Sequence, residues 1–311
     1  MNKKALAYVM LTVSSVIFGF SFLFTKETLA HLDIFQLLGL RFLLAAAIMA
    51  VLALTGVIKL NLSAYKIKAM LPLVLLQPTV YFIGETYGIK LTSSSESGMM
   101  IALMPIAIAL FSVRILKERL IMRQWLAVAA SVAGVALIVG EGGFTASGNI
   151  SGYLLLIMAV IAEGLYSPLA KRMTQKCAPV EMTFIMICAG AVVFNAIGLT
   201  EAAAVGTLGT YFTDALQPGV ITGLLYLSAL SSVAAFFFYN YALSKVKASS
   251  SASFCNLTTV VSVFAGVIFG GEELKLIQAA GMALILISIW GIVSERAPRI
   301  SEEIADISIK S

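Results

Sequence analysis

Long apolar segments follow one another along almost the entire chain, separated by short polar connections. A membrane-spanning helix needs about 20 predominantly apolar residues, and ten segments reach roughly that length. Their approximate limits are residues 6–26, 34–55, 68–89, 93–116, 123–140, 150–170, 180–199, 218–243, 248–270 and 276–294. This pattern predicts an all-α integral membrane protein with ten transmembrane helices.

The composition supports placement in a bilayer. Of the 311 residues, 60% are apolar and 12% are charged, which leaves too little polar surface for a soluble domain. The longest predicted connection, 200–217, and the terminal segment 294–311 are too short to fold independently. We therefore expect a single functional unit inside the helical bundle.

The distribution of basic residues predicts an orientation, because Lys and Arg accumulate in the cytoplasmic loops of membrane proteins. With the N-terminus inside, the inner connections hold sixteen of the 21 basic residues. Both termini are therefore predicted to be cytoplasmic, and the lipid bilayer is an expected partner. The net charge of +5 follows from the same bias, and no basic cluster is dense enough to indicate nucleic-acid binding.

Metal and disulfide chemistry are not expected. Cys177, Cys188 and Cys255 are odd in number and two of them lie in apolar segments, which argues against a disulfide framework. His31 is the only histidine and lies in a predicted outer turn, so a His-based metal site is not expected. The sequence predicts no cofactor.

The two halves of the chain repeat the same polar positions. At one constant offset, the pairs are Tyr87 and Tyr241, Ser95 and Ser249, Ser97 and Ser251, Glu118 and Glu272, Leu120 and Leu274, and Gln124 and Gln278. Each half contains five predicted spans, an odd number, so the second half enters the membrane from the opposite side. We interpret residues 1–145 as the first five-helix repeat and residues 146–311 as the second, inverted repeat with a short cytoplasmic tail.

Short motifs recur at matching places in the predicted spans. They are Gly19, Phe22, Lys26 and Arg41, then Tyr87–Gly88–Ile89–Lys90, Met104–Pro105, Lys117–Glu118–Arg119–Leu120 and Gly271–Glu272–Glu273–Leu274. Together they resemble the drug/metabolite transporter superfamily, and its EamA-type permeases most closely. The resemblance covers essentially the whole chain and implies export or exchange of small metabolites, amino acids or drugs across the inner membrane.

Ionisable residues inside the predicted spans indicate where function resides, because burying a charge in hydrocarbon costs at least about 2.5–3.5 kcal/mol. Four such residues stand out: Arg41, Glu85, Arg114 and Glu163. Arg114 lies one turn from the inner end of its span, where its side chain can reach water. Arg41 and Glu85 lie at nearly the same depth and could pair. Glu85 is therefore either a structural ion partner or a ligand-binding residue.

Glu163 is the strongest candidate site residue. It lies roughly 12 Å from the inner end of its span at 1.5 Å per residue, and no basic residue within a span shares this depth. A carboxyl group there must be protonated or solvated by a cavity. We expect Glu163 to carry a proton or to balance the charge of an ammonium-bearing solute, which makes protons a candidate partner.

Other polar and aromatic residues are predicted to line the same cavity. Gln77, Tyr81 and Glu85 fall at helical spacing on one face of the third span. The repeat places Tyr239 and Asn240 at equivalent levels of the eighth span. Tyr166 and Ser167 follow Glu163 by three and four residues and so extend its face. The remaining predicted lining residues are Phe18, Phe22 and Asn256, the last because it lies at a similar depth. Aromatic faces with a few polar groups suit a small amphipathic or zwitterionic solute, although helix packing is the alternative role for each aromatic residue.

Glu118 and Glu272 occupy matching repeat positions near opposite membrane faces, so they cannot form one binding pair. We interpret both as structural residues. Each lies where one predicted span ends and the next begins. Each could cap the following helix or pair with a nearby basic residue, namely Arg119, Arg123 or Lys275.

Other classes of membrane protein fit the sequence less well. An enzyme would need a nucleophile–base set or a metal cluster, and too little chain lies outside the predicted spans to hold one. A channel would be expected to show rings of like side chains or a filter loop. A carrier of phosphate-bearing or sugar-nucleotide solutes would place Lys or Arg in the cavity, where this chain has Glu163.

The sequence therefore predicts a secondary transporter, not an enzyme, that moves a small organic metabolite by alternating access. An amino acid or an amine-like solute fits the candidate residues. Export or exchange is implied by the family resemblance alone, and a phosphate carrier or a channel stays as the alternative. The sequence leaves open the exact solute, the coupling to protons and the oligomeric state.

Overall fold

The computed structural model describes residues 3–91, 103–118, 121–140, 150–270 and 276–293. Within these ranges the chain consists of helices and short connections, with no strand. Six helical stretches are long and apolar enough to cross a membrane: Lys3–Leu29, Ile34–Leu54, Ala64–Gly88, Ile150–Met173, Pro179–Val205 and Pro218–Lys245. The prediction of an all-helical membrane protein is confirmed for the described residues.

The helices of the described chain carry the following bounds. They are α1 (Lys3–Leu29), α2 (Ile34–Leu54), α3 (Ala64–Val74), the π-helical segment η1 (Leu75–Val80), α4 (Tyr81–Leu91), α6 (Met104–Leu116), α7 (Met122–Gly140), α8 (Ile150–Met173), α9 (Pro179–Val205), the short 3₁₀ turn η2 (Asp214–Leu216), α10 (Pro218–Leu225), the π-helical segment η3 (Tyr226–Ala235), α11 (Phe236–Lys245), α12 (Ala248–Gly270) and α13 (Leu276–Val293).

Recognisable capping residues set several helix ends. The Ser63 side chain accepts a hydrogen bond from the Lys66 amide and so begins α3. Pro179 occupies the first turn of α9, where its missing N–H costs no hydrogen bond. Gly206 ends α9 in the left-handed conformation, with φ of 86°, which glycine adopts without a steric penalty.

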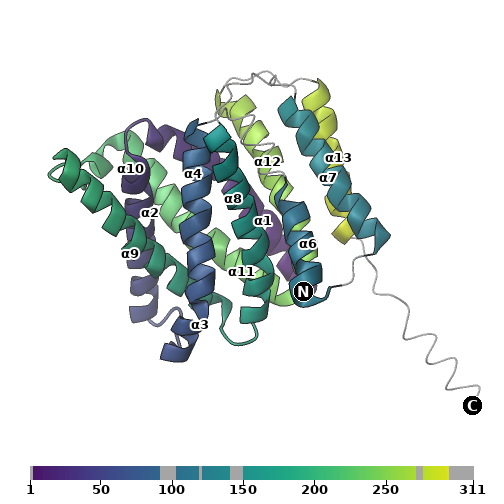
Figure 1. Ribbon diagram of the computed structural model, residues 1–311, viewed down its shortest axis with the longest axis horizontal. Coiled ribbons are helices and arrows are strands. Elements are labelled where there is room, and N and C mark those ends of the chain that lie inside the picture. Colours follow the sequence, from purple (N-terminus) through teal and green to yellow (C-terminus); the bar gives the residue numbers. More distant parts are fainter. Residues whose placement is uncertain (1–2, 92–102, 119–120, 141–149, 271–275, 294–311) are drawn as a thin grey trace, which may run out of the picture.

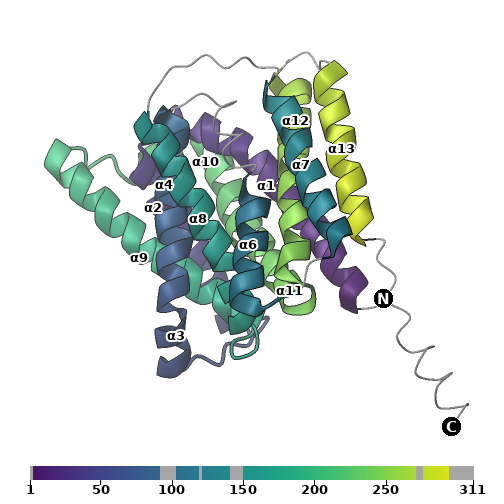
Figure 2. The ribbon, with the colours of Figure 1, turned by 45° about the vertical axis from the view of Figure 1, so that its right-hand side comes forward.

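Helices from the first half of the chain pack mainly against helices from the second half. The most extensive contacts join α2 to α9, α7 to α13, α1 to α12, and α8 to both α4 and α6. Figures 1 and 2 show α7 and α13 side by side at one edge of the bundle, with α9 at the opposite edge. The two halves therefore interlock rather than form separate bodies.

Large apolar side chains cover the outside of the bundle as well as its interior. Leu54, Val192 and Ile287 are among many exposed aliphatic residues on the helices. Such a surface would be unfavourable in water, whereas hydrocarbon solvates it without cost. The outer faces of the helices thus suit contact with lipid.

Two of the long helical stretches contain a break at their centre. The stretch Ala64–Gly88 changes to π-helical hydrogen bonding at η1, where Gln77 has the non-helical angles φ −141° and ψ 123°. Pro72 and Pro78 lie in this stretch, and each lacks the N–H that a continuous α-helix needs. The stretch Pro218–Lys245 changes to π-helical bonding at η3. Gln77 in η1 and Ser231 in η3 are buried, so both segments pass through the interior of the bundle.

The ends of the bundle differ in charge. We call one end the basic end, because its helix termini and connections carry Lys59, Lys66, Lys117, Lys171, Arg172, Lys176, Lys245 and Lys247. We call the other the acidic end, because Asp33, Glu201 and Asp214 line a cavity of about 580 Å³ there, together with His31 and Lys90. At the basic end, Lys66 of α3 forms an ion pair with Glu181 of α9 at 2.8 Å.

Candidate functional site

The carboxyl group of Glu163 lies at the centre of a hydrogen-bonded cluster between α8 and α11. Its Oε1 accepts hydrogen bonds from the Ser167 hydroxyl at 2.8 Å and from the Tyr239 hydroxyl at 3.1 Å. The hydroxyl oxygens of Ser167 and Tyr239 are themselves 2.6 Å apart. Ser167 follows Glu163 by one turn, so helical spacing accounts for that contact. All three side chains are buried.

The second carboxyl oxygen of Glu163 has no hydrogen-bond partner among the described residues. This Oε2 atom is buried. The Oε1 atom of Gln77 in η1 is also buried and also has no hydrogen-bond partner among the described residues. A buried acceptor without a donor costs about 1–3 kcal/mol. Either a proton on Glu163 or a donor group from a ligand would remove that cost at Oε2.

A second buried layer lies next to the Glu163 cluster. The Tyr166 hydroxyl lies 2.9 Å from Asn240 Oδ1 and 3.0 Å from the sulfur of Met186. The Asn240 amide donates to Thr183 Oγ1 of α9 at 3.1 Å. Tyr166 directly precedes Ser167 in the chain, and Asn240 directly follows Tyr239. The hydrogen bonds of each layer therefore help to fix the positions of the side chains in the other layer.

Tyr81 and Glu85 of α4 form a pair beside this cluster. The Tyr81 hydroxyl donates to Glu85 Oε1 at 2.6 Å. Glu85 is also near enough to Glu163 to interact with it electrostatically. The structure therefore brings two carboxyl groups and two tyrosines into one polar region, which Cys255 of α12 also adjoins through Tyr239.

Arg41 of α2 does not form a direct ion pair with Glu85 in the described chain. Its Nε donates to Ser232 Oγ at 2.8 Å and its Nη2 to Ser231 Oγ at 2.9 Å. The guanidinium carbon also lies 5.0 Å from the centre of the Phe82 ring, a cation–π geometry. Arg41 thus connects α2 to η3. Its interaction with Glu85, which was predicted as a possible pair from their similar depth, is a longer-range electrostatic attraction.

Helical spacing was a wrong guide for Gln77. Gln77, Tyr81 and Glu85 were predicted to share one face of a continuous helix. The non-helical backbone at Gln77 interrupts that register, so the argument applies to Tyr81 and Glu85 alone. The side chain of Gln77 is nevertheless buried.

Asn256 and Phe18 contact residues that do not belong to the Glu163 cluster. The Asn256 amide donates to Ser131 of α7 at 2.6 Å, so this side chain joins α12 to α7. Phe18 packs edge-on against Phe236, with ring centres 5.4 Å apart. Phe22 is half-buried on α1. Phe18 therefore belongs to helix packing.

The cluster also contains residues that the sequence argument did not select. Thr183, Met186 and Ser232 complete the hydrogen bonds of Asn240, Tyr166 and Arg41. They lie on α9 and η3, and spacing within one helix gives no information about partners on another helix. A polar residue in an apolar helix was the available signal for Thr183 and Ser232.

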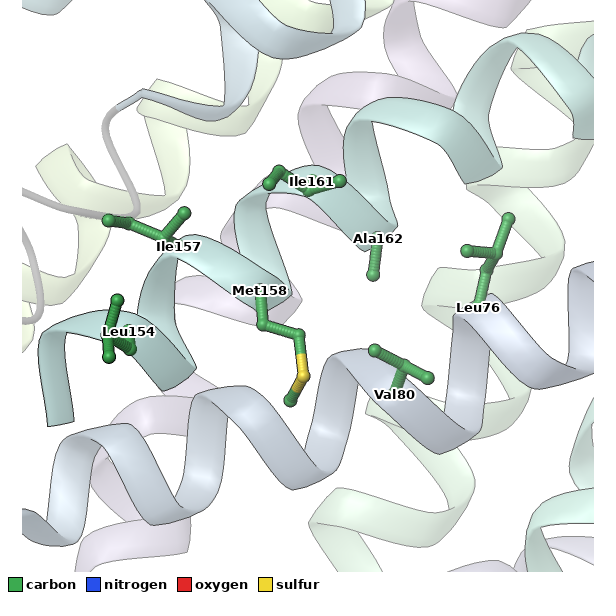
Figure 3. A pocket seen from close by; sticks show the side chains of 7 residues that line it. All are labelled: Leu76, Val80, Leu154, Ile157, Met158, Ile161 and Ala162. Carbon is green, nitrogen blue, oxygen red and sulfur yellow. The ribbon is translucent and has the colours of Figure 1, made fainter. Parts of the chain in front are cut away.

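An apolar groove lies on the outside of α8, away from these polar groups. Figure 3 shows Met158 and Ala162 of α8 pointing toward Leu76 and Val80, with Leu154, Ile157 and Ile161 completing the lining. Its volume is about 270 Å³. Aliphatic walls and outward-facing neighbours suit lipid contact, so we do not assign this groove to the solute.

Comparison with known proteins agrees with the arrangement of the helices. The model of the EamA-like transporter family matches residues 5–140 and 150–294. The chain belongs to this family. The two matched ranges together cover most of the described helices, and they identify a multi-pass membrane transporter.

Relatives of this EamA-like transporter include bacterial and archaeal proteins. The uncharacterized transporter YcxC of Bacillus subtilis is 37% identical over 291 residues, which are 93% of each chain. An uncharacterized transporter of Archaeoglobus fulgidus is 24% identical over 93% of this chain and 99% of its own. A solved crystal structure covers 93% of this chain and 98% of its own, with a TM-score of 0.75 and 18% identity, and supports the fold alone.

Proposed function

We propose that this EamA-like transporter is a secondary transporter of small organic solutes that carry an ammonium group, such as amines or amino acids. The observation that carries the proposal is the buried Glu163 carboxyl, which has one oxygen held by Ser167 and Tyr239 and the other without a partner. An ammonium group supplies the missing donor and the opposite charge.

The chemistry of the cluster favours exchange between a proton and the solute. A buried carboxylate needs a compensating charge, and a proton or an ammonium group can meet that need in turn. Tyr239 and Tyr81 place aromatic rings close to the two carboxyl groups, and ring faces attract organic cations. Arg41 is already bound by Ser231 and Ser232, which disfavours a phosphate-bearing solute.

The transport cycle is proposed to be alternating access between two inverted five-helix halves, residues 1–145 and 146–311, that together form ten spans. The central breaks at η1 and η3 support this arrangement, because they lie in corresponding long stretches of the two halves. Basic loops face the cytoplasm in most membrane proteins. The basic end is accordingly assigned to the cytoplasmic face of the inner membrane, with export or exchange as the direction.

Counterflow in proteoliposomes tests the proposal. Vesicles loaded with unlabelled alanine, lysine or putrescine are assayed for uptake of the same labelled compound at two pH values. We expect saturable, pH-dependent uptake by the wild type, and uptake near background for Glu163→Gln, because the amide cannot carry the charge or the proton. Glu27→Gln makes the same substitution at an exposed position of α1 and should leave uptake unchanged.

Three results would contradict the proposal. Equal and equally pH-dependent uptake by Glu163→Gln would remove Glu163 from the cycle. Flux that never saturates would favour a channel. Uptake of phosphate-bearing compounds in place of amines would favour the alternative carrier class.

A further inference from the structure

Glu118 makes an unexpected contact at the basic end. The residue follows α6, and its side chain reaches the first turn of α12. Oε1 accepts from the Ala248 amide at 3.1 Å, and Oε2 accepts from the Ser249 amide at 3.3 Å and from the Ser249 hydroxyl at 2.5 Å. A carboxylate at the N-terminus of a helix is favoured by the unpaired amides and by the helix dipole.

This contact joins the two halves of the transporter. Glu118 was expected to cap the following helix or to pair with a neighbouring basic residue, and the helix that it caps is α12 of the other half. Its repeat counterpart, Glu272, lies outside the described residues. Lys117, directly before Glu118, takes the left-handed conformation with φ 54°, which is uncommon for a residue other than glycine. The chain thus turns sharply at the point where Glu118 leaves α6.

A second helix holds the same connection. The Lys171 ammonium group, near the end of α8, donates to the backbone oxygen of Val246. Lys171 also attracts Glu118 electrostatically. The connection between α11 and α12 is therefore bound by Glu118, which follows α6, and by Lys171 of α8.

The position of this connection relates it to the candidate site. Tyr239 and Asn240 lie on α11 shortly before it, and Glu163 lies on α8 before Lys171. Eight residues of α8 separate Glu163 from Lys171, or about 12 Å at 1.5 Å per residue. The helices α8 and α11 thus connect the buried cluster to the contacts at the start of α12.

We propose that the contact of Glu118 with Ala248 and Ser249 is a latch that closes the basic end and is released in each transport cycle. The inference rests on the proposed alternating access. Polar contacts suit this role, because water replaces them when they part, whereas separation of an apolar contact exposes hydrocarbon. Glu118 is only half-buried, so water can reach it on release.

Thiol labelling tests the latch without knowledge of the solute. A reporter cysteine, Ser167→Cys, is placed in the buried cluster, and everted vesicles are treated with a membrane-impermeant maleimide. Loss of a helix cap of this kind shifts an equilibrium by roughly 5- to 30-fold. We expect Glu118→Gln to speed labelling of the reporter by that factor, Ser249→Ala to speed it less, and Glu27→Gln to leave it unchanged.

A cross-link distinguishes a released contact from a permanent cap. Glu118→Cys with Ser249→Cys is joined by a short bis-maleimide whose spacer contains a reducible disulfide, and the single-cysteine variants serve as controls for the native thiols. We expect reporter labelling from the basic end to stop on cross-linking and to return on reduction.

Two outcomes would overturn the latch. One is labelling in the cross-linked protein at the uncross-linked rate. The other is Glu118→Gln and Ser249→Ala variants that elute as monodisperse protein and label at the wild-type rate. Neither readout requires transport of a solute. If the proposed substrate class proves wrong, labelling and cross-linking still decide whether the latch exists.

Discussion

The third residue of α2 and the third residue of α9 perform the same task at opposite ends of the bundle, with different chemistry. Gln36 accepts from the Asp33 amide at 3.4 Å, and Glu181 accepts from the Ala178 amide at 2.9 Å. Each side chain therefore caps its own helix. Each side chain also contacts the other half of the chain. Gln36 contacts the segment before the stretch Pro218–Lys245, and Glu181 contacts the segment before the stretch Ala64–Gly88.

The partners across the halves differ in charge. At the acidic end, the Gln36 amide donates to the Tyr211 carbonyl at 3.0 Å and to Asp214 Oδ2 at 3.3 Å. At the basic end, Glu181 accepts from Lys66 at 2.8 Å and from the Asn61 amide at 2.9 Å. The contact between Gln36 and Asp214 has one charged member, whereas the contact between Glu181 and Lys66 has two and is shorter. We call each of these sets of contacts a corner, and the corner at Glu181 is the stronger of the two.

Removal of the stronger corner should give the largest effect. Glu181→Ala leaves Lys66 without its ion-pair partner and the Asn61 and Ala178 amides without an acceptor. We expect a loss of about 2–3 kcal/mol in stability and a thermal unfolding temperature several degrees lower in detergent. Gln36→Ala is the matched control and should cost less than about 1 kcal/mol. Equal losses for the two variants would remove the asymmetry.

An ion pair built at the acidic end should sharpen the comparison. Gln36→Glu combined with Asp214→Lys copies the arrangement of Glu181 and Lys66. An exposed pair contributes up to about 1 kcal/mol, or roughly a fivefold change in an equilibrium. We expect slower maleimide labelling of the Ser167→Cys reporter from the acidic end. Gln36→Glu alone places two carboxylates together and should speed it, and matching rates for both variants would contradict the prediction.

The smallest effect should be a change in thiol reactivity. Burial, together with the hydrogen bond to Glu181, raises the pKa of the Cys177 thiol to about 12. Glu181→Gln removes the carboxylate, so the pKa of Cys177 should fall and the thiolate fraction at a given pH should rise. We expect faster alkylation of Cys177, measured by mass spectrometry, with Cys188 as the internal reference. An unchanged rate would mean that burial alone controls this thiol.

Much of the architecture followed from the sequence because hydrophobic segment length is a local property. Apolar segments predicted a helical membrane protein, and motif residues such as Gly19 and Arg41 predicted the family. The candidate site was only partly accessible in the same way. Spacing within α8 related Ser167 to Glu163, whereas Thr183 and Ser232 meet their partners across helices.

The failures have physical causes as well. Gln77 departs from its predicted face because the prolines around η1 interrupt the hydrogen bonds that define helical periodicity. The contact of Asn256 with Ser131 of α7 could not be predicted, because depth does not fix the direction in which a side chain points around its helix. Glu118 reached a helix that is distant in sequence, which no argument from neighbouring residues could identify.

The breaks at η1 and η3 also bear on the mechanical stiffness of the bundle. An unbroken helix resists bending because each added degree strains a continuous set of backbone hydrogen bonds. At η1 the regular pattern is already interrupted by Pro78 and by the extended angles of Gln77. Flexing at this point therefore strains fewer bonds than flexing in the middle of α9, whose only proline is in its first turn. The two broken stretches should act as compliant joints, which lets rigid neighbouring helices tilt while their packed faces stay together.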